Sequence, residues 1–215
     1  MELRCSAFLF DLDGVLVDSR GAVERVCRLW AQRHGLDPKQ VLRIAHGRRS
    51  RDTVRAAAPH LDADREAAWI DAVELADVAG LSAVAGAGAL LAALPTAGWA
   101  VVTSCGRPLA ERRLTAVGLP NPRILVTSEE VAQGKPAPDG YRLGAKRLGQ
   151  NPATCVVFED APAGIAAARA AGARVIGLTT MLAAEALTGA DATIPDFTAI
   201  RVRQDHAGFV VTTEI

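Results

Sequence analysis

Six polar residues follow, or form the last positions of, three short apolar runs of the chain: Asp11, Asp13, Thr103, Ser104, Glu159 and Asp160. A seventh, Lys135, lies in a Gly-Lys-Pro sequence after a further apolar run. Carboxylates that converge repel one another, so they bind a cation or share a proton. Oxygen ligands without a nearby histidine or cysteine favour Mg²⁺, which also bridges to phosphate. Because lysine and hydroxyl groups complement phosphate oxygens, these residue types indicate metal-assisted phosphoryl transfer with an aspartate as nucleophile.

The elements that must position these residues alternate along the chain. Short apolar runs, typical of strands buried on both faces, occur at 7–10, 99–103, 123–126, 155–158 and 174–178. Helical patterns occur at 83–94, 108–117, 139–148 and 161–171, and glycines at 98, 118, 149 and 172 are expected to end them. This alternation predicts an α/β fold with a doubly wound, mostly parallel, Rossmann-like sheet. Ligands bind at the carboxyl edge of such a sheet, where the polar residues are expected to meet.

One stretch interrupts the alternation of strands and helices. From about residue 19 to residue 80 the sequence has no strand pattern, only helical patterns at 22–33, 51–58 and 63–78. We therefore expect a small, all-helical cap at 18–80, inserted after the first strand of an α/β core formed by 1–17 and 81–215. The end of the chain, 200–211, has the pattern of a terminal hairpin that turns at 204–208.

Composition limits the classes of partner and location. The 215 residues contain 24 basic and 24 acidic side chains, so the basic excess of a nucleic-acid binder is absent. No stretch reaches about 18 uninterrupted apolar residues, so no membrane partner is expected. The four cysteines form no C-x-x-C pair, which favours a reducing, cytoplasmic location. No dimerisation stripe is evident, so the expected state is a monomer.

Four segments, FLFDLDGVLVDS, VVTS, GKPAPD and FEDAPAG, follow one another in that order. Together they resemble the four motifs of the haloacid dehalogenase-like hydrolases over about residues 7–178. The resemblance implies that Asp11 is the nucleophile and Asp13 the general acid and base. It also implies that Thr103, Lys135 and the backbone amide of Ser104 hold the phosphate.

The same resemblance implies a magnesium site. Asp11, Asp160 and the backbone carbonyl of Asp13 would bind Mg²⁺, with Glu159 either a direct ligand or one step removed. The place of the cap, after the first motif, is that of the phosphoglucomutase-like branch of the family.

Longer segments narrow the resemblance within that branch. WAQRHGL, IAHGRRSRDT, VTSEEVAQGKPAPDGYRLGAKRLG and VVFEDAPAGIAAARAAG resemble bacterial sugar phosphatases and the yeast-type 2-deoxyglucose-6-phosphate and glycerol phosphatases. This implies that His46, Gly47 and Arg49 belong to a cap loop facing the substrate. The expected activity is Mg²⁺-dependent hydrolysis of small sugar or polyol phosphates, with broad specificity.

Each of these residues also has a plain structural interpretation. Aspartates at 11 and 13 suit a polar turn, and Thr103 with Ser104 suits a helix N-cap. The acids at 159 and 160 suit the first turn of the following helix. Lys135 and the arginines at 48–51 suit a solvated surface. The order of the four motifs along the chain favours the functional interpretation.

Four other activities are weighed against hydrolysis. Hexose-phosphate mutases of the branch carry a histidine where this chain has Val23, which argues against the mutase alternative. Dehalogenases lack the second aspartate, which is present as Asp13, and phosphonate cleavage needs a cap lysine, whereas Lys39 lies outside the expected position. A non-catalytic sugar-phosphate-binding protein is expected to have lost a motif residue, and none is lost here.

Overall fold

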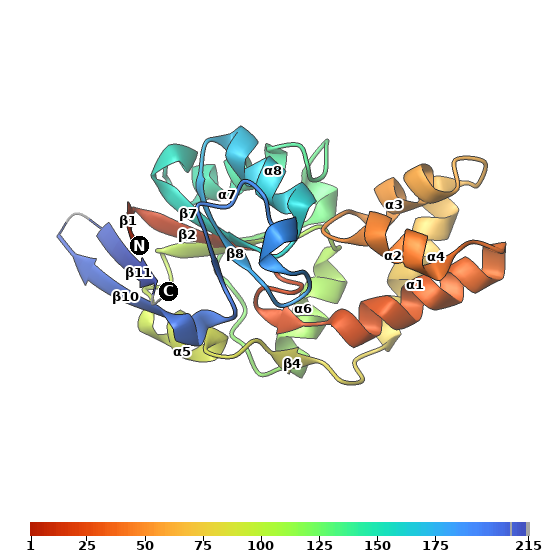
Figure 1. Ribbon diagram of the computed structural model, residues 1–215, viewed down its shortest axis with the longest axis horizontal. Coiled ribbons are helices and arrows are strands. Elements are labelled where there is room, and N and C mark those ends of the chain that lie inside the picture. The colour runs from red at the N-terminus through yellow and green to blue at the C-terminus, as the bar shows by residue number, and fades with distance from the viewer. Residues whose placement is uncertain (207, 214–215) are drawn as a thin grey trace.

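A six-stranded parallel sheet forms the centre of the computed structural model, which describes residues 1–206 and 208–213 (Figure 1). In spatial order its strands are β6 (Leu125–Val126), β5 (Trp99–Val102), β2 (Ala7–Phe10), β7 (Cys155–Glu159), β8 (Arg174–Leu178) and β9 (Ala192–Ile194). Every neighbouring pair is parallel, which confirms the predicted doubly wound α/β architecture. The chain runs outward in one direction from β2 to β6 and in the other from β7 to β9, so the strand order reverses beside β2.

The sheet buries both of its faces. Phe8, Phe10 and Phe158 pack on one side with α5 (Ala87–Ala93) and α6 (Arg107–Ala116). Leu9 and Val157 face the other side, which α7 (Asp139–Arg147) and α8 (Pro162–Ala171) cover (Figure 1). Because both sets of alternate residues enter a core, the strands are continuous apolar runs without polar alternation. This explains why these strands could be recognised in the sequence.

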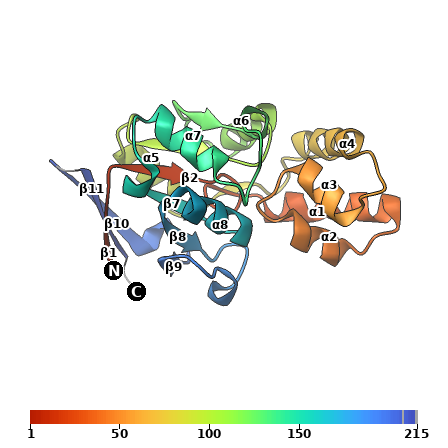
Figure 2. The ribbon, with the colours of Figure 1, turned by 90° about the horizontal axis from the view of Figure 1, so that it is seen from above.

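Four helices lie between two short strands beside the sheet. The helices are α1 (Arg20–His34), α2 (Pro38–Ala45), α3 (Ser50–Ala57) and α4 (Ala63–Ala76). Before and after them, β3 (Val17–Asp18) and β4 (Ser82–Ala83) pair in antiparallel fashion. Figure 2 shows the helices as a separate group beyond one end of the sheet. They have their own small core, which includes Trp30, Val41 and Val54.

The helices differ from the expected ones in two places. Helix α2 was not expected from the sequence, although its start carries two common signals. Asp37 caps it by accepting a hydrogen bond from the Lys39 amide, and a proline occupies the first helical position. The helix expected over 83–94 begins at Ala87, because 82–83 pair as β4. It ends at Ala93, so the expected stop at Gly98 is wrong. Gly172, in contrast, does end α8, with φ of 92°.

A second, three-stranded antiparallel sheet lies at the opposite end of the molecule from the four helices (Figure 1). The predicted terminal hairpin is confirmed as β10 (Ile200–Asp205) and β11 (Gly208–Thr213), with residue 207 outside the described residues. Two further strands were not expected from the sequence: β1 (Glu2–Cys5), which pairs with β11, and β9. The run expected at 123–126 is a strand only at 125–126.

The remaining described elements are four short 3₁₀ turns: η1 (Ser128–Glu130), η2 (Pro152–Thr154), η3 (Ala184–Ala186) and η4 (Phe197–Ala199). Among the described residues, no helix has the length and apolar character needed to cross a membrane.

Phe8→Ala tests the core beneath the site. The fully buried Phe8 ring has centroid distances of 6.1, 6.0 and 5.0 Å to Phe10, Phe158 and Phe209. Its removal leaves a cavity, so we expect the free energy of unfolding in urea to fall by about 3–5 kcal/mol. Leu29→Ala, at a side chain that is 49% exposed, is the control and should change it by less than about 0.5 kcal/mol. Equal losses in the two variants would contradict this assignment of the core.

Candidate active site

The polar residues after β2, β5 and β7 converge because these three strands are neighbours. Asp11 follows β2, Thr103 follows β5, and β7 ends at Glu159 with Asp160 next. Lys135 comes from the loop between β6 and α7, and its ammonium group reaches this edge of the sheet. The structure therefore brings together the strand-end residues that the sequence analysis singled out.

Lys135 connects two of the carboxylates. Its Nζ donates to Asp11 Oδ1 at 2.7 Å and to Glu159 Oε1 at 2.6 Å, and all three side chains are buried. Burial by itself lowers the pKa of Lys135, but the two carboxylates outweigh burial and raise it. The lysine is therefore a fixed positive charge. It engages Oδ1 of Asp11, which leaves Oδ2 as the atom available for other chemistry.

Glu159 has donors on both of its oxygens. Besides Lys135, Oε1 accepts a hydrogen bond from the Tyr141 hydroxyl at 2.7 Å. Oε2 accepts from the backbone amides of Asp160 at 3.0 Å and Ala161 at 3.2 Å. Such saturation orients the carboxylate and ties the lysine to the start of α8. Tyr141, which the sequence analysis missed, is fully buried.

Three carboxylates lie close enough to hold one divalent cation. Oxygen atoms of Asp11, Glu159 and Asp160 lie within 4.8 Å of one another. Burial raises the pKa of Asp160 well above its usual value, and the charges of Glu159 and Asp11 raise it further. Burial likewise raises the pKa of Asp11, although Lys135 opposes the shift. One lysine cannot balance three carboxylates, so an all-oxygen donor set with surplus negative charge fits a hard divalent cation.

Asp13 has a different partner from Asp11. Its Oδ2 accepts a hydrogen bond from Arg113 Nη1 at 2.6 Å. Its Oδ1 is buried and has no hydrogen-bond partner among the described residues. Arg113 is a buried residue of α6, and its Nη2 lies 3.3 Å from Oε1 of Glu74 in α4.

Neither Arg113 nor Glu74 was expected at the site from the sequence. A signal for the arginine was present, because it occupies the core-facing side of α6 with Leu109, Ala110 and Leu114. A charged residue on that side of a helix needs a buried partner.

Thr103 and Ser104 occupy the loop after β5. Thr103 is buried and lines the pocket, and its Oγ1 accepts from the Cys105 amide at 3.2 Å. The Ser104 hydroxyl donates to the Gly47 carbonyl at 2.9 Å, which links this loop to the helical segment. Burial raises the pKa of the Cys105 thiol, so it stays protonated and is a poor nucleophile.

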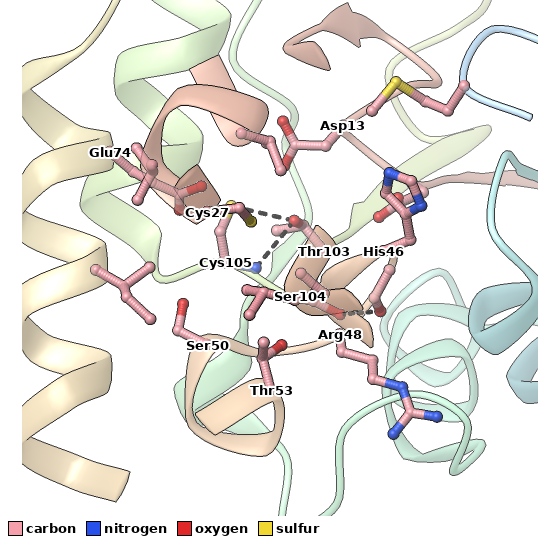
Figure 3. A pocket seen from close by; sticks show the side chains of 18 of the residues that line it. Asp13, Cys27, His46, Arg48, Ser50, Thr53, Glu74, Thr103, Ser104 and Cys105 are labelled. Atoms are coloured by element: carbon pink, nitrogen blue, oxygen red, sulfur yellow. Dashed lines mark hydrogen bonds between the residues drawn. The ribbon is translucent and has the colours of Figure 1, made fainter. Parts of the chain in front are cut away.

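The helical segment covers the carboxylates and closes a pocket over them (Figure 3). Side chains of Asp13 and Thr103 from one part and of His46 and Glu74 from the other surround the same space. Much of the helical side of the pocket is apolar, with lining residues Val23, Val26, Trp30, Val41, Ala45 and Ile70. Burial lowers the pKa of His46, so the ring is neutral near pH 7.

The other two residues predicted to face the substrate, Gly47 and Arg49, differ from each other in position. Gly47 lines the pocket with φ of 71°, and a Cβ there would lie 2.7 Å from that of Ala161. Arg49 does not line this pocket: its Nε bonds Asp52 at 2.6 Å, and Nη1 reaches the Val131 carbonyl at 3.4 Å. Arg48, its neighbour, does line the pocket.

Comparison with known proteins identifies the family to which the chain is similar. The model of the hydrolase family described as haloacid dehalogenase-like hydrolase matches residues 5–172. The chain is 42% identical to hexitol phosphatase A of Escherichia coli (strain K12), over 97% of this chain and 99% of that protein. It is 33% identical to 2-deoxyglucose-6-phosphate phosphatase 2 of Saccharomyces cerevisiae, over 94% and 92% of the two chains.

A solved structure supports the same relationship. A hydrolase from Pseudomonas syringae superposes with a TM-score of 0.79 at 25% identity, covering 89% of this chain and 94% of that one. The resemblance to this family and to sugar phosphatases is confirmed.

Gly164→Ala tests how closely Glu159 is held. A Cβ on Gly164 would overlap the Glu159 carboxylate, so alanine must displace the group that anchors Lys135. We expect the free energy of unfolding to fall by about 1–3 kcal/mol. The matched control is Gly88→Ala in α5, where the nearest atom lies 3.6 Å from the added Cβ. It should be neutral or stabilising by up to about 1 kcal/mol. A neutral Gly164→Ala would refute the close fit.

Proposed function

The chain belongs to the haloacid dehalogenase-like hydrolases, and from that premise we propose that it hydrolyses small sugar or polyol phosphates through an aspartyl-phosphate on Asp11. Its relatives are named phosphatases, and the chain is accordingly a phosphoric monoester hydrolase. The observation that carries the mechanism is the buried Asp11 carboxylate, bound through one oxygen to Lys135 at the floor of a covered pocket.

The substrate class comes from the two relatives. One is named for hexitol phosphates and the other for 2-deoxyglucose 6-phosphate, and both align with nearly the whole chain, including the four helices. The pocket has room on its helical side for an uncharged carbon skeleton against apolar walls, with Ser50 and Thr53 as polar groups at its margin. We therefore assign phosphorylated sugars and polyols, with broad specificity, as substrates.

The proposed reaction has two steps. Asp11 Oδ2 attacks phosphorus, the bond from phosphorus to the sugar oxygen breaks, and Asp13 gives that oxygen a proton. Asp13 then takes a proton from a water molecule that attacks the aspartyl-phosphate, and phosphate leaves with Asp11 restored. Lys135 and Thr103, with the Ser104 amide, hold the phosphate oxygens in place. Lys135 lowers the pKa of Asp11 against the larger effect of burial, which favours the ionised form of the nucleophile.

We propose Mg²⁺ as the cation of the acidic group, held by Asp11, Asp160 and the backbone carbonyl of Asp13. Glu159 has donors on both oxygens, so we assign it to holding Lys135 and the α8 amides rather than the metal. When bound, Mg²⁺ neutralises charge that develops on the phosphate oxygens.

We further propose that residues 18–80 act as a cap over a core of 1–17 and 81–215. The substrate would enter with the cap open, and closure would exclude bulk water. His46 and Gly47 would then face the substrate. Arg49, paired with Asp52 and near the Val131 carbonyl, would help to dock the cap on the core.

A mutase activity is disfavoured, because this chain has no proton-transferring group at the position where hexose-phosphate mutases of the branch have a histidine. Val23 lines the pocket at that position, and its apolar side chain cannot activate a sugar hydroxyl. Cytoplasmic location and a monomeric state complete the proposal, together with the absence of nucleic-acid and membrane partners.

Asp11→Asn tests the nucleophile. Phosphate release from sorbitol 6-phosphate, 2-deoxyglucose 6-phosphate, glycerol phosphate and p-nitrophenyl phosphate is measured with Mg²⁺ present. The amide cannot form the aspartyl-phosphate, so we expect kcat to fall by about 1000-fold or more with unchanged circular dichroism. Asp64→Asn, an exposed aspartate of α4, is the control. Retained activity in Asp11→Asn would contradict the proposed mechanism. Conversion of glucose 1-phosphate to glucose 6-phosphate, without phosphate release, would favour the mutase.

Removal of Mg²⁺ tests the acidic group without an activity assay. Thermal unfolding is followed in EDTA and in excess Mg²⁺. At 100 times its Kd, the cation should stabilise the fold by about 2.7 kcal/mol, which raises Tm by roughly 5–10 °C. Asp160→Asn removes a ligand and one of three crowded charges. In EDTA this variant should therefore be at least as stable as the natural chain, yet gain nothing from Mg²⁺. An undiminished Mg²⁺ effect would place the cation elsewhere.

A further inference from the structure

One buried guanidinium links three segments of the molecule at the pocket. Arg113 of α6 is 3% exposed, and its Nη1 lies 2.6 Å from Asp13 Oδ2 in the loop after β2. Its Nη2 lies 3.3 Å from Oε1 of Glu74, which comes from α4 among the four helices. All three residues line the pocket. The arginine thus contacts the proposed acid and base on one side and the proposed cap on the other.

Packing alone does not account for Arg113. Its neighbours on the buried side of α6 are Leu109, Ala110 and Leu114, where an apolar side chain would avoid the cost of burying a charge. Its Nε and Nη2 are both buried without a hydrogen-bond acceptor among the described residues, so the 3.3 Å approach of Nη2 to Glu74 is an ion pair rather than a hydrogen bond. The helix therefore carries a guanidinium that is incompletely satisfied, and its two close ionic contacts are the ones to Asp13 and Glu74.

The contact between Arg113 and Asp13 involves one of the two carboxylate oxygens. Arg113 engages Oδ2, while Oδ1 is buried and has no hydrogen-bond partner among the described residues. Asp13 as a residue lines the pocket. The buried guanidinium is planar and rigid, so its single hydrogen bond from Nη1 to Oδ2 restrains the rotation of the Asp13 carboxylate. Proton transfer requires such orientation, because the acid must lie within hydrogen-bond reach of the leaving oxygen.

Glu74 brings the helical segment into this arrangement. Helix α4 packs against α6, and the Glu74 side chain is only 12% exposed. Without Glu74, one side of the buried guanidinium would lose its counter-charge. One of the two counter-charges of Arg113 therefore comes from α4, and the other comes from Asp13 of the core.

We propose that Arg113 is a positioning residue that orients Asp13 for proton transfer, and that Glu74 of the cap holds Arg113 in that orientation. The inference rests on the acid and base role proposed above for Asp13. It implies that proton transfer is set up only when the cap is closed.

The test uses the leaving group. A sugar or polyol alkoxide leaves poorly without a proton, whereas p-nitrophenolate leaves as an anion. The value of kcat/KM covers the steps up to departure of the leaving group. It therefore reports on protonation of the leaving oxygen and is insensitive to the later attack of water on the aspartyl-phosphate. Misplacement of Asp13 should lower kcat/KM for sorbitol 6-phosphate and spare that for p-nitrophenyl phosphate. A general loss of folding or packing would lower both.

Arg113→Lys keeps the charge and loses the planar fork. With Mg²⁺ present, we expect kcat/KM for sorbitol 6-phosphate to fall by about 10- to 100-fold and that for p-nitrophenyl phosphate by less than about threefold. Asp13→Asn should show the same selective loss. The matched control is Arg112→Lys, an exposed neighbour on α6, which should leave both values unchanged. Equal losses on the two substrates in Arg113→Lys would overturn the inference.

Glu74→Gln tests the link to the cap and keeps the side-chain shape. It should produce the same selective loss, to a smaller extent, and add nothing further in the Arg113→Lys background, because both residues act through one contact. Independent, multiplicative losses would overturn the link. If Arg113→Lys fails to fold by circular dichroism, Glu74→Gln alone decides: a selective loss supports the inference, and an unselective or absent one refutes it.

Failure of the proposed function has a different signature. If the natural chain releases no phosphate, or if Asp11→Asn remains active, the phosphatase mechanism fails and the inference falls with it. If the natural chain is active and Arg113→Lys behaves like Arg112→Lys, only the inference fails.

Discussion

The structure depends on the burial of one lysine among crowded carboxylates. Removing charges from water is costly, and the cost is recovered only where opposite charges meet at hydrogen-bond distance and the remaining lone pairs are satisfied. Lys135 meets Asp11 at 2.7 Å and Glu159 at 2.6 Å, and Tyr141 with two backbone amides completes the set around Glu159. These contacts require β2 and β7 to be neighbours and the loop before α7 to reach over them. The strand order of the sheet therefore determines whether the site can form.

Close approach of backbones is the second requirement. Gly164 leaves room beneath Glu159, and Gly47 allows the helical segment to reach Ala161. A Cβ on Gly134 would lie 2.5 Å from Arg49 Nε, so the loop that carries Lys135 also receives an arginine of the helical segment. Where glycine provides the space, two surfaces can meet without a layer of water. A dry contact of this kind strengthens each charge interaction inside the pocket.

Two aspartates of one loop acquire different surroundings. Asp11 lies against Lys135 and the other acids, whereas Asp13 lies against Arg113. The first has a point charge on one oxygen, and the second has a planar guanidinium that sets its rotation. Because the neighbouring charges differ, two residues of the same type can take different roles in one site. The two counter-charges come from different loops and helices, so the division of roles is a property of the assembled fold.

The strands that carry the site, and the residues that end them, were predictable from the amino-acid sequence. Strands buried on both faces are apolar throughout, and their polar ends stand out because that change is local. The terminal hairpin was visible for a different reason: apolar and basic residues alternate at 200–203, a polar stretch suits the turn, and a second apolar run follows. Helix α2 could have been recognised from Asp37 and Pro38, whereas the two-residue strands β3 and β4 have too little pattern to detect.

The pairing of the charges, in contrast, depends on how the elements pack together. Arg48 and Arg49 are equivalent as neighbours in a basic run, yet one lines the pocket and the other bonds Asp52. The pattern of α6 places Arg113 toward the interior, but no local feature specifies that its partners are Asp13 and Glu74. Local preferences act over a few residues, whereas a buried ion pair depends on the packing of elements far apart in the chain. The sequence therefore determined the chemistry at the edge of the sheet, and the packing of the helices decided how each group is held.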